Sequence, residues 1–324
     1  MKKRLAASLL LSCISLGALP RPAAAQLDTT RPIRIQVGYV SGSFDATGRI
    51  IADGLRDRLG VNAIVENRPG AGGSIASDYV AKAPADGTVI LIGGAGTHGV
   101  TPAVRRNLPF DAARDFTAIA RVSEFPNVMA ISARAPVHSV QEFIRWARRP
   151  GGVNFGSSGT GTSIHLTGEL FRLRTGLEMT HVPYRGSAPA VLDLQSDRIQ
   201  VIFDNLPNVF GGIQGGTLRA LAVTSPERVP TLPEVPTMAE AGMPDFVVSS
   251  WVGVFGPANM NPKTVEQLSA AIMDTVRSAM GQTRIANLGA RPSPAGPAEF
   301  DAMWRADMRR WSEVVQAAKI ELDD

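Results

Sequence analysis

Short apolar strands alternate with amphipathic helices along most of this 324-residue chain. The first unit is a strand over 33–38, a turn-rich loop, and a helix that we expect Asp45 to cap and Gly60 to end. Further strands are expected at 61–66 and 88–92, with a helix over 74–82 between them. Strands separated by crossover helices form parallel sheets, so the pattern predicts an α/β fold.

The second part of the chain follows the same logic without repeating the sequence. The expected strands are at 127–132, 153–156, 181–182, 201–203 and 220–223, and the expected helices are at 140–148, 164–175 and 187–194. A Pro-rich segment, a strand over 247–255 and two helices, 262–280 and 297–318, complete the chain. About 300 residues exceed the usual size of one core, so we expect two lobes.

The N-terminus predicts export. Lys2, Lys3 and Arg4 precede an apolar run over 5–19, and Ala23–Ala25 fits a cleavage site of the A-x-A type. The run has roughly 15 residues, against about 20 for a membrane-spanning helix. We therefore interpret 1–25 as a signal peptide. A lipoprotein cleavage box ending at Cys13 is the alternative.

Removal of residues 1–25 would change the net charge of the chain and remove its cysteine. This segment holds four of the 33 basic residues and no acidic residue, which leaves 29 basic against 29 acidic residues. A nucleic-acid-binding role needs a basic face, and this composition does not predict one. Cys13 is the only cysteine, so the mature chain would have no disulfide, no cysteine metal ligand and no cysteine nucleophile.

Three expected strands end in loops of small and hydroxylic residues that lead into helices, namely 39–45, 93–98 and 156–163. Ligands of open α/β sheets lie beyond the carboxyl ends of the strands, and free N–H groups at helix starts suit anions. The loops therefore predict an anion site built from backbone and hydroxyl groups. The alternative is that they are ordinary tight turns, which favour the same residues. Asp204 ends another apolar strand and is expected either to face this crevice or to cap the next turn.

Signatures of catalysis are sparse. The chain has no G-x-S-x-G elbow and no phosphate-binding P-loop, and its four histidines lack metal-ligand spacing. A triad of Ser158, His165 and Asp204 is conceivable, but His165 is better explained as a helix-packing or capping residue. The tryptophans at 146, 304 and 311 are expected in the core, whereas Trp251 could line a cleft or be buried.

Several stretches together resemble the solute receptors of the tripartite tricarboxylate transporter family, the Bug receptors. The resemblance covers essentially the whole mature chain, in order. The matching stretches are Arg31–Ile35, Val65–Gly73, Ala83–Gly87, Gly96–His98, Phe125–Val128, Phe155–Leu166, His181–Gly186, Phe203–Pro207, Leu221–Ser225 and Leu232–Thr237.

The resemblance implies a two-lobed periplasmic binding protein of type II, in which each lobe is a mostly parallel sheet flanked by helices and the ligand cleft lies between them. Lobe one would comprise 27–125 and 250–324, and lobe two 126–249, with crossings near Phe125–Pro126 and Ser249–Trp251. The ligand would be a small organic anion such as a carboxylate, an amino acid or an aromatic acid. The expected ligand-binding residues are Tyr39, Ser41, Gly42, Asp45 and Thr97 in lobe one, and Ser158, Thr160, Thr162, Tyr184 and Asp204 in lobe two.

The resemblance further implies a monomeric periplasmic protein that needs no cofactor, is not an enzyme and delivers its ligand to membrane transporter subunits. A sensor input for a signalling partner remains an alternative, as does a hydrolase or transferase, which turnover of a bound ester would reveal. An effector domain of a transcription regulator shares this fold but would need a DNA-binding helix pair at the N-terminus.

The first loop departs from the family pattern, which is aromatic-Pro-Pro-Gly-Gly-x-x-Asp. Here the loop is Tyr39-Val40-Ser41-Gly42-Ser43-Phe44-Asp45, which has neither proline and lacks the second glycine. Their loss changes the backbone conformations open to the loop. Phe44 and Tyr39 raise the hypothesis of an aromatic or unusual ligand. Thr162→Ala is expected to weaken binding by about 1–2 kcal/mol, the scale of one hydrogen bond.

Overall fold

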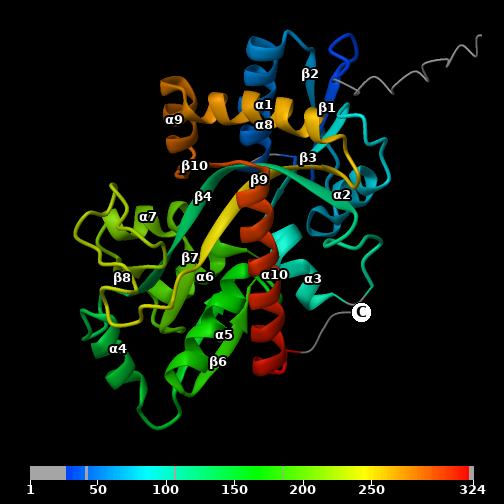
Figure 1. Cartoon of the computed structure of the whole chain (residues 1–324). Helices are drawn as coiled ribbons and strands as arrows, with labels where there is room; N and C mark the ends of the chain where they lie inside the picture. The colour runs from blue at the N-terminus through cyan, green and yellow to red at the C-terminus, as the bar shows by residue number, and fades with distance from the viewer. Residues whose placement is uncertain (1–26, 41–42, 106, 185, 321–324) are drawn as a thin grey trace, which may run out of the picture.

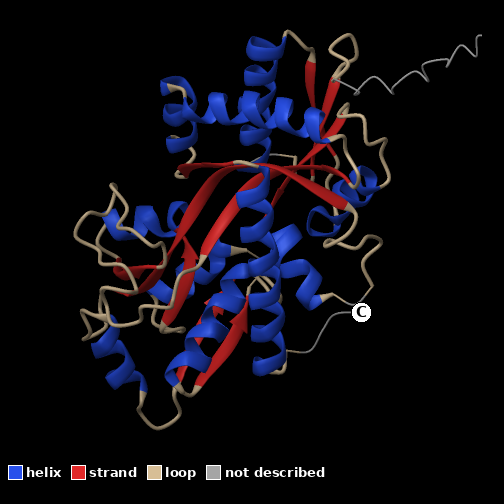
Figure 2. Ribbon diagram, in the orientation of Figure 1, coloured by secondary structure: helices blue, strands red, loops and turns tan. Residues whose placement is uncertain are grey.

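The computed structural model describes residues 27–40, 43–105, 107–184 and 186–320. The expected signal peptide, Cys13, Ser41 and Gly42 lie outside these residues. Within them, ten strands form one continuous, strongly curled sheet (Figure 2). Its main path runs β2-β1-β3-β9-β4-β7-β5-β6, while β8 and β10 pair with β4 beside that path. The expected α/β class is confirmed.

The first half of the sheet is built on β1 (Ile33–Val37), β2 (Ala63–Asn67) and β3 (Val89–Gly94), which pair in parallel. Helices α1 (Ser43–Leu59) and α2 (Ser74–Ala81) connect them, with a short 3₁₀ turn, η1 (Ala71–Gly73), before α2. After β3 the chain forms a π-helical turn, η2 (Ala95–Val100), and the short helix α3 (Thr101–Val104). The expected glycine-rich loop after β3 is therefore largely helical.

The second half repeats this arrangement with β5 (Val153–Ser157), β6 (Met179–Pro183) and β7 (Val201–Asn205), which also pair in parallel. Its helices are α4 (Val140–Ala147), α5 (Ser163–Thr175), α6 (Ser187–Gln195) and α7 (Leu206–Gln214), and β8 (Leu218–Val223) completes the sheet. The expected Ser139 cap of α4 is present, because Ser139 Oγ accepts from Glu142 N at 3.2 Å. The capping box is not complete, since Glu142 Oε2 accepts from His138 N rather than from Ser139 N.

Two long strands join the halves. The first part of β4 (Phe116–Ser132) pairs antiparallel with β9 (Ser249–Pro257), as far as Pro126 opposite Ser249. From Asn127 onward β4 pairs instead with β7 and β8, again antiparallel. Parallel pairing is thus confined to the two outer groups of strands, because the connecting strands must run back and forth between the halves.

The C-terminal region covers the first half and then spans both halves. Helices α8 (Pro262–Arg277) and α9 (Ala279–Ala286) replace the single expected helix, and Ser278 ends the one and caps the other. Strand β10 (Arg291–Ala295) was not expected, since its two prolines each remove a ladder donor. It pairs with β4.

Helix α10 (Pro297–Ala318) lies across β4 and β9 and extends along both halves (Figure 1). Its Trp304 packs in the core with β3 and β9, and Trp311 packs in the core of the second half. The prediction that both are core residues is confirmed, whereas Trp146 is only partly buried. One helix therefore contributes to the hydrophobic cores of both ends of the molecule.

Candidate functional site

The loop after β1 is fixed by hydrogen bonds to neighbouring loops. The Tyr39 hydroxyl donates to Gly72 O at 3.0 Å, and the Tyr39 carbonyl accepts from Asn67 Nδ2 at 2.6 Å. The same amide donates to Asp45 Oδ1 at 2.8 Å. Asp45 is not the expected helix cap, because α1 already begins at Ser43, and its carboxylate instead pairs with Arg49 at 2.9 Å. The Arg49 guanidinium is the main cause that lowers the pKa of Asp45.

Thr97 lies in the turn after β3 and is almost fully buried. Its hydroxyl accepts from Gly94 N at 3.1 Å and lies 2.8 Å from His98 Nδ1. Gly73, at φ 95°, passes so close that an added Cβ would lie 2.7 Å from Thr97 Cγ2 and 3.5 Å from the Tyr39 hydroxyl. Only a glycine fits this conformation and this approach. Three loops of the first half therefore converge at Tyr39 and Thr97.

A hollow of about 280 Å³ opens beside Tyr39. It is lined by Gly38, Tyr39, Val40, Pro69, Gly70, Gly72 and Gly73. His98, next to Thr97, faces the core rather than this hollow, since it stacks on Phe255 at 4.4 Å. Burial lowers the pKa of His98 to about 3, so this histidine is neutral at physiological pH.

The loop after β5 is organised by Thr162. Thr162 caps α5, because its hydroxyl accepts from His165 N at 3.2 Å, and the same hydroxyl donates to Gly159 O at 2.8 Å. Ser158 is half-buried and its carbonyl accepts from Gly186 N, while Thr160 is exposed. Thr162 therefore has a structural role in the helix start that the sequence analysis did not assign to it.

The candidate triad of Ser158, His165 and Asp204 is not assembled. His165 Nδ1 accepts from Gly161 N at 3.1 Å, and the ring stacks on His181 at 3.7 Å. The serine that contacts a histidine is Ser157, and its hydroxyl is buried against His181 Nε2. The expectation that His165 is a packing and capping residue is confirmed.

Tyr184 reaches toward α6. Its hydroxyl donates to Asp193 Oδ2 at 2.8 Å. Burial, followed by the neighbouring Asp193 carboxylate, raises the pKa of Tyr184 to about 12. The ring also lies beside the last residues of β5, because a Cβ on Gly156 would lie 3.5 Å from Tyr184 Cε2.

Asp204 ends β7 and is fully buried. Its Oδ1 accepts from Asn205 N at 2.7 Å and from Asn208 Nδ2 at 2.8 Å, so it does contact the start of α7. Its other oxygen, Oδ2, is buried without a partner among the described residues. Burial is the main cause that raises the pKa of Asp204.

More buried polar atoms without a described partner lie at the junction of β4, β7 and β9. Asn127 is fully buried with both amide atoms unpaired, and it stands directly opposite Asn205, whose Oδ1 is also unpaired. The Ser250 hydroxyl is unpaired one register position before the end of the β4–β9 ladder. Sequence reasoning assigned no role to these three residues. The sequence signal that could have identified them is their position, since each is a polar residue at an end or a change of partner of an otherwise apolar strand.

The two groups of loops approach each other at α3. A Cβ on Gly161, in the loop after β5, would lie 3.1 Å from Val104 Cγ2 at the end of α3. The halves also meet at Gly289, whose added Cβ would lie 2.6 Å from Pro207 Cγ. The two halves thus contact each other where a glycine of one half meets a side chain of the other. The loops around Tyr39 belong to the first half and the loops around Asp204 to the second.

Two general features bear on the chemistry. In the part of the chain that the structure describes, no three His, Cys, Asp or Glu side chains come close enough together to form a metal site. No helix among the described residues has the length and apolar character of a membrane span.

Comparison with known proteins gives a consistent result. Residues 47–320 match the model of the tripartite tricarboxylate transporter family receptor. The chain is 34% identical to BugT of Bordetella pertussis over 312 residues, which is 95% of this chain and 96% of BugT. Among solved structures, it resembles R. palustris Rpa4515 with adipate, with a TM-score of 0.75 and 36% identity over 90% of this chain and 98% of that one. It also resembles MatC from Rhodopseudomonas palustris with bound malate, with a TM-score of 0.70 and 28% identity over 88% and 99% of the two chains.

The family model thus covers well over half of the chain, and these solved relatives share its mixed α/β fold over nearly their full lengths. This chain belongs to the tripartite tricarboxylate transporter receptor family.

Proposed function

We propose that this protein is a periplasmic receptor that captures a small organic anion between two lobes and delivers it to membrane transporter subunits. The lobes are 27–125 with 250–324, and 126–249. In support, Pro126 and Ser249 are the last pair of the β4–β9 ladder, and β4 changes its partners at the next residue. Two connecting strands allow lobes to rotate about them as ligand closes the cleft.

The observation that best supports an anion ligand is the position of the loops at the starts of α1, α5 and α7. Each lies at the carboxyl end of a parallel strand, where the free N–H groups and the dipole of the following helix favour negative charge. Rpa4515 and MatC are described with adipate and malate, both of which are dicarboxylates. We infer that the ligand here is a small carboxylate.

The ligand should also bring a hydrogen-bond donor. Asp204 Oδ2 is buried without a described partner, and a buried unpaired acceptor costs about 1–3 kcal/mol. A hydroxyl or amino group on the ligand would remove that cost. The proposed site keeps the ten residues expected from the sequence, namely Tyr39, Ser41, Gly42, Asp45, Thr97, Ser158, Thr160, Thr162, Tyr184 and Asp204.

Phe44 bears on the hypothesis of an aromatic ligand. Its ring lies 5.0 Å from that of Tyr39, and it packs so closely on Gly94 that an added Cβ there would lie 2.6 Å from Phe44 Cζ. Phe44 therefore fills space between the first loop and β3. Aromatic acids remain in the test panel because the Tyr39 ring borders the hollow described above.

We propose further that the protein is exported through the signal peptide 1–25, acts as a monomer and catalyses no reaction. The membrane partner would be the transporter or, in the alternative, a sensor. These proposals follow from membership of a receptor family.

The decisive experiment is a thermal-shift screen of residues 26–324 against adipate, malate, citrate, amino acids and aromatic acids. A ligand that binds only the folded state at 100 times its Kd stabilises it by about 2.7 kcal/mol. We expect a clear rise in Tm with at least one small carboxylate, confirmed by calorimetric titration. The absence of a shift with every carboxylate would refute the proposed function.

A further inference from the structure

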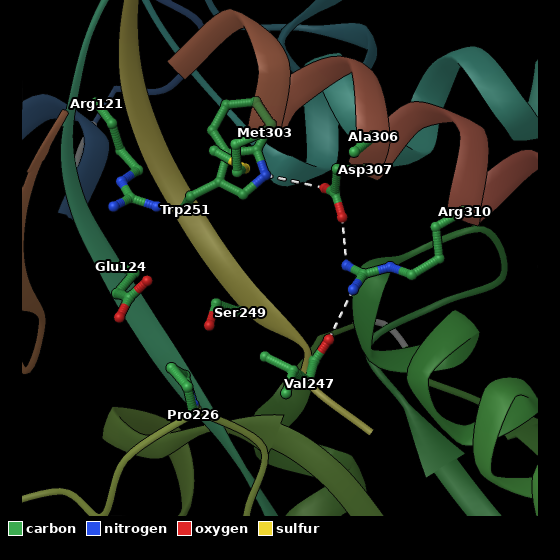
Figure 3. Close-up of a pocket in the computed structure, with 10 residues that line it drawn as sticks. All are labelled: Arg121, Glu124, Pro226, Val247, Ser249, Trp251, Met303, Ala306, Asp307 and Arg310. Atoms are coloured by element: carbon green, nitrogen blue, oxygen red, sulfur yellow. Dashed lines mark hydrogen bonds and ion pairs between the residues drawn. The ribbon is translucent and has the colours of Figure 1, made fainter. Parts of the chain in front are cut away.

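A second cavity of about 350 Å³ lies between α10 and the connecting strands (Figure 3). None of the ligand-binding residues proposed above lines it. Its lining consists of Arg121 and Glu124 from β4, Ser249 and Trp251 from β9, Met303, Ala306, Asp307 and Arg310 from α10, and Pro226 and Val247. Such a volume is within the range of small-molecule sites.

The α10 wall of this cavity is held by polar contacts that leave one buried donor free, since Arg310 Nε has no partner among the described residues. Trp251 Nε1 donates to Asp307 Oδ2 at 2.9 Å, and the other Asp307 oxygen accepts from Arg310. Arg310 also donates to Val247 O at 2.6 Å. Trp251 and Asp307 are both about 95% buried or more. The Asp307 and Arg310 charges therefore compensate each other, and the Trp251 ring is held in place as an apolar surface.

The β4 wall, by contrast, leaves charged atoms available. Arg121 donates through Nε to Ser293 O at 2.9 Å, but its nearest carboxylate among the described residues is Glu299 at 4.0 Å, on a side chain that is 72% exposed. Glu124 is nearly buried and forms an ion pair with Arg291, whose Nε and Nη2 both donate to Oε1, so that Oε2 is the oxygen left open. Its Oε2 and the Ser249 hydroxyl have no hydrogen bond to another described residue. Figure 3 shows all three side chains directed toward the same open space.

We propose that this cavity binds a small zwitterionic amino acid, with its carboxylate on Arg121 and Ser249 and its ammonium group on Glu124 Oε2. A simple anion at this place would meet the Glu124 carboxylate, and a simple cation would meet the Arg121 guanidinium. A molecule that carries an ammonium and a carboxylate group on the same carbon satisfies both groups. An apolar side chain would lie against Trp251, Met303 and Val247.

Occupation of the cavity would be coupled to movement of the lobes. Ser249 and Trp251 pair with Pro126 and Glu124, at the point where β4 leaves β9. A bound amino acid would contact both strands of this connection, and Arg310 ties α10 to Val247 just beyond it. Because coupling between two sites is reciprocal, binding here would change the affinity of the cleft for its anion, and the reverse. Binding of the amino acid does not rest on the proposed function, whereas its coupling to the cleft does.

The test is calorimetric titration of residues 26–324 with L-leucine and L-methionine, up to about 10 mM, a limit that still detects weak binding. The matched half-ligands are 4-methylpentanoate, which lacks the amino group, and 3-methylbutylamine, which lacks the carboxylate. We expect at least one amino acid to bind saturably, and each half-ligand to bind about tenfold more weakly or worse, since bonds to charged groups are worth about 1.5–3 kcal/mol.

Variants then locate the site. Arg121→Gln and Ser249→Ala should weaken amino-acid binding, by about tenfold for the charged group. Arg309→Gln makes the same change as Arg121→Gln on the exposed side of α10 and should have no effect. Failure of both amino acids to bind would overturn the proposal. So would binding that survives Arg121→Gln and Ser249→Ala but is lost in Asp204→Asn, because the amino acid would then occupy the cleft.

Discussion

The polar side chains of the candidate site differ between the two halves in how completely they are hydrogen-bonded within the protein. In the first half, the Tyr39 hydroxyl, the Asp45 carboxylate and the Thr97 hydroxyl all have partners within the protein. In the second half, Asp204 keeps one fully buried oxygen without a described partner, and Asn127, which stands opposite the next residue Asn205, has none for its amide. The contrast holds for these side chains and not for the whole halves, since Thr47 Oγ1 in the first half is also unpaired and the Thr162 and Tyr184 hydroxyls in the second half are paired. Asp204 and Asn127 are thus the second-half groups that a ligand can satisfy.

The largest expected effect comes from Asp204→Asn, which removes the charge but preserves the shape. If Asp204 accepts from the ligand, the variant should bind it roughly tenfold to a hundredfold more weakly, since a hydrogen bond to a charged group is worth about 1.5–3 kcal/mol. Calorimetric titration with the ligand from the thermal-shift screen measures this. Unchanged affinity would remove Asp204 from the site and end the contrast between the halves. Asp45→Asn is the matched change in the first half and should affect binding less.

The same variant should be more stable without ligand. Burial raises the pKa of Asp204 above its unfolded value, so the folded state holds the proton more tightly. Stability is therefore lost as the pH rises from the unfolded pKa, near 4, through the folded pKa. Asp204→Asn should raise Tm at pH 7, with a difference that narrows toward pH 3. A lower Tm at pH 7 would contradict the assignment of an unpaired buried carboxylate.

The second-largest effect is expected from Thr162→Ala. The variant loses the cap of α5, which should lower the unfolding free energy by about 1 kcal/mol. The loss of affinity of about 1–2 kcal/mol expected from the sequence would add to this if the hydroxyl also contacts the ligand. Chemical denaturation and titration separate the two effects. Thr162→Ser, which keeps the hydroxyl, is the control. An undiminished free energy of unfolding in Thr162→Ala would argue against the cap.

The smallest effect is expected from Tyr39→Phe. This variant loses the bond to Gly72 O, worth about 0.5–1.5 kcal/mol, at a half-buried position. Tyr184→Phe is its counterpart in the second half and should cost somewhat more, since its acceptor is the Asp193 carboxylate. Denaturant unfolding of both variants compares them directly. A larger loss in Tyr39→Phe would show that the first loop depends more on this bond than the structure indicates.

Much of the fold was predictable because it is local. Apolar runs marked β1, β3, β5 and β7 to within two residues, and helix α10 was predicted with its observed bounds. The strands that the sequence missed lie beside or contain proline, whereas the split of α8 from α9 at Ser278 and the helical turn after β3 were missed without one. The first part of β4 precedes Pro126, and β10 contains two prolines, so neither resembles a typical strand. Pairing with β9 and β4 stabilises these segments, and such partners lie more than 100 residues away along the chain.

The loops of the candidate site could be located from the sequence, whereas the binding role of their residues stays a prediction. The loops after β1, β3 and β5 were identified from their small and hydroxylic residues, and Asp204 from its place near the end of an apolar strand. The use of each hydroxyl was not, because Thr162 could equally have faced a ligand or, as observed, His165 N.

By itself, the sequence determined the alternation of strands and helices, the cap of α4, and the family to which the chain belongs. Periodicity, caps and turns depend on residues within a few positions of one another, so they are readable locally. Only the tertiary structure decided which polar atoms stay unpaired and where cavities form. Arg121, Glu124, Ser249 and Asp307 share one cavity because β4, β9 and α10 pack together, and no local pattern specifies that meeting.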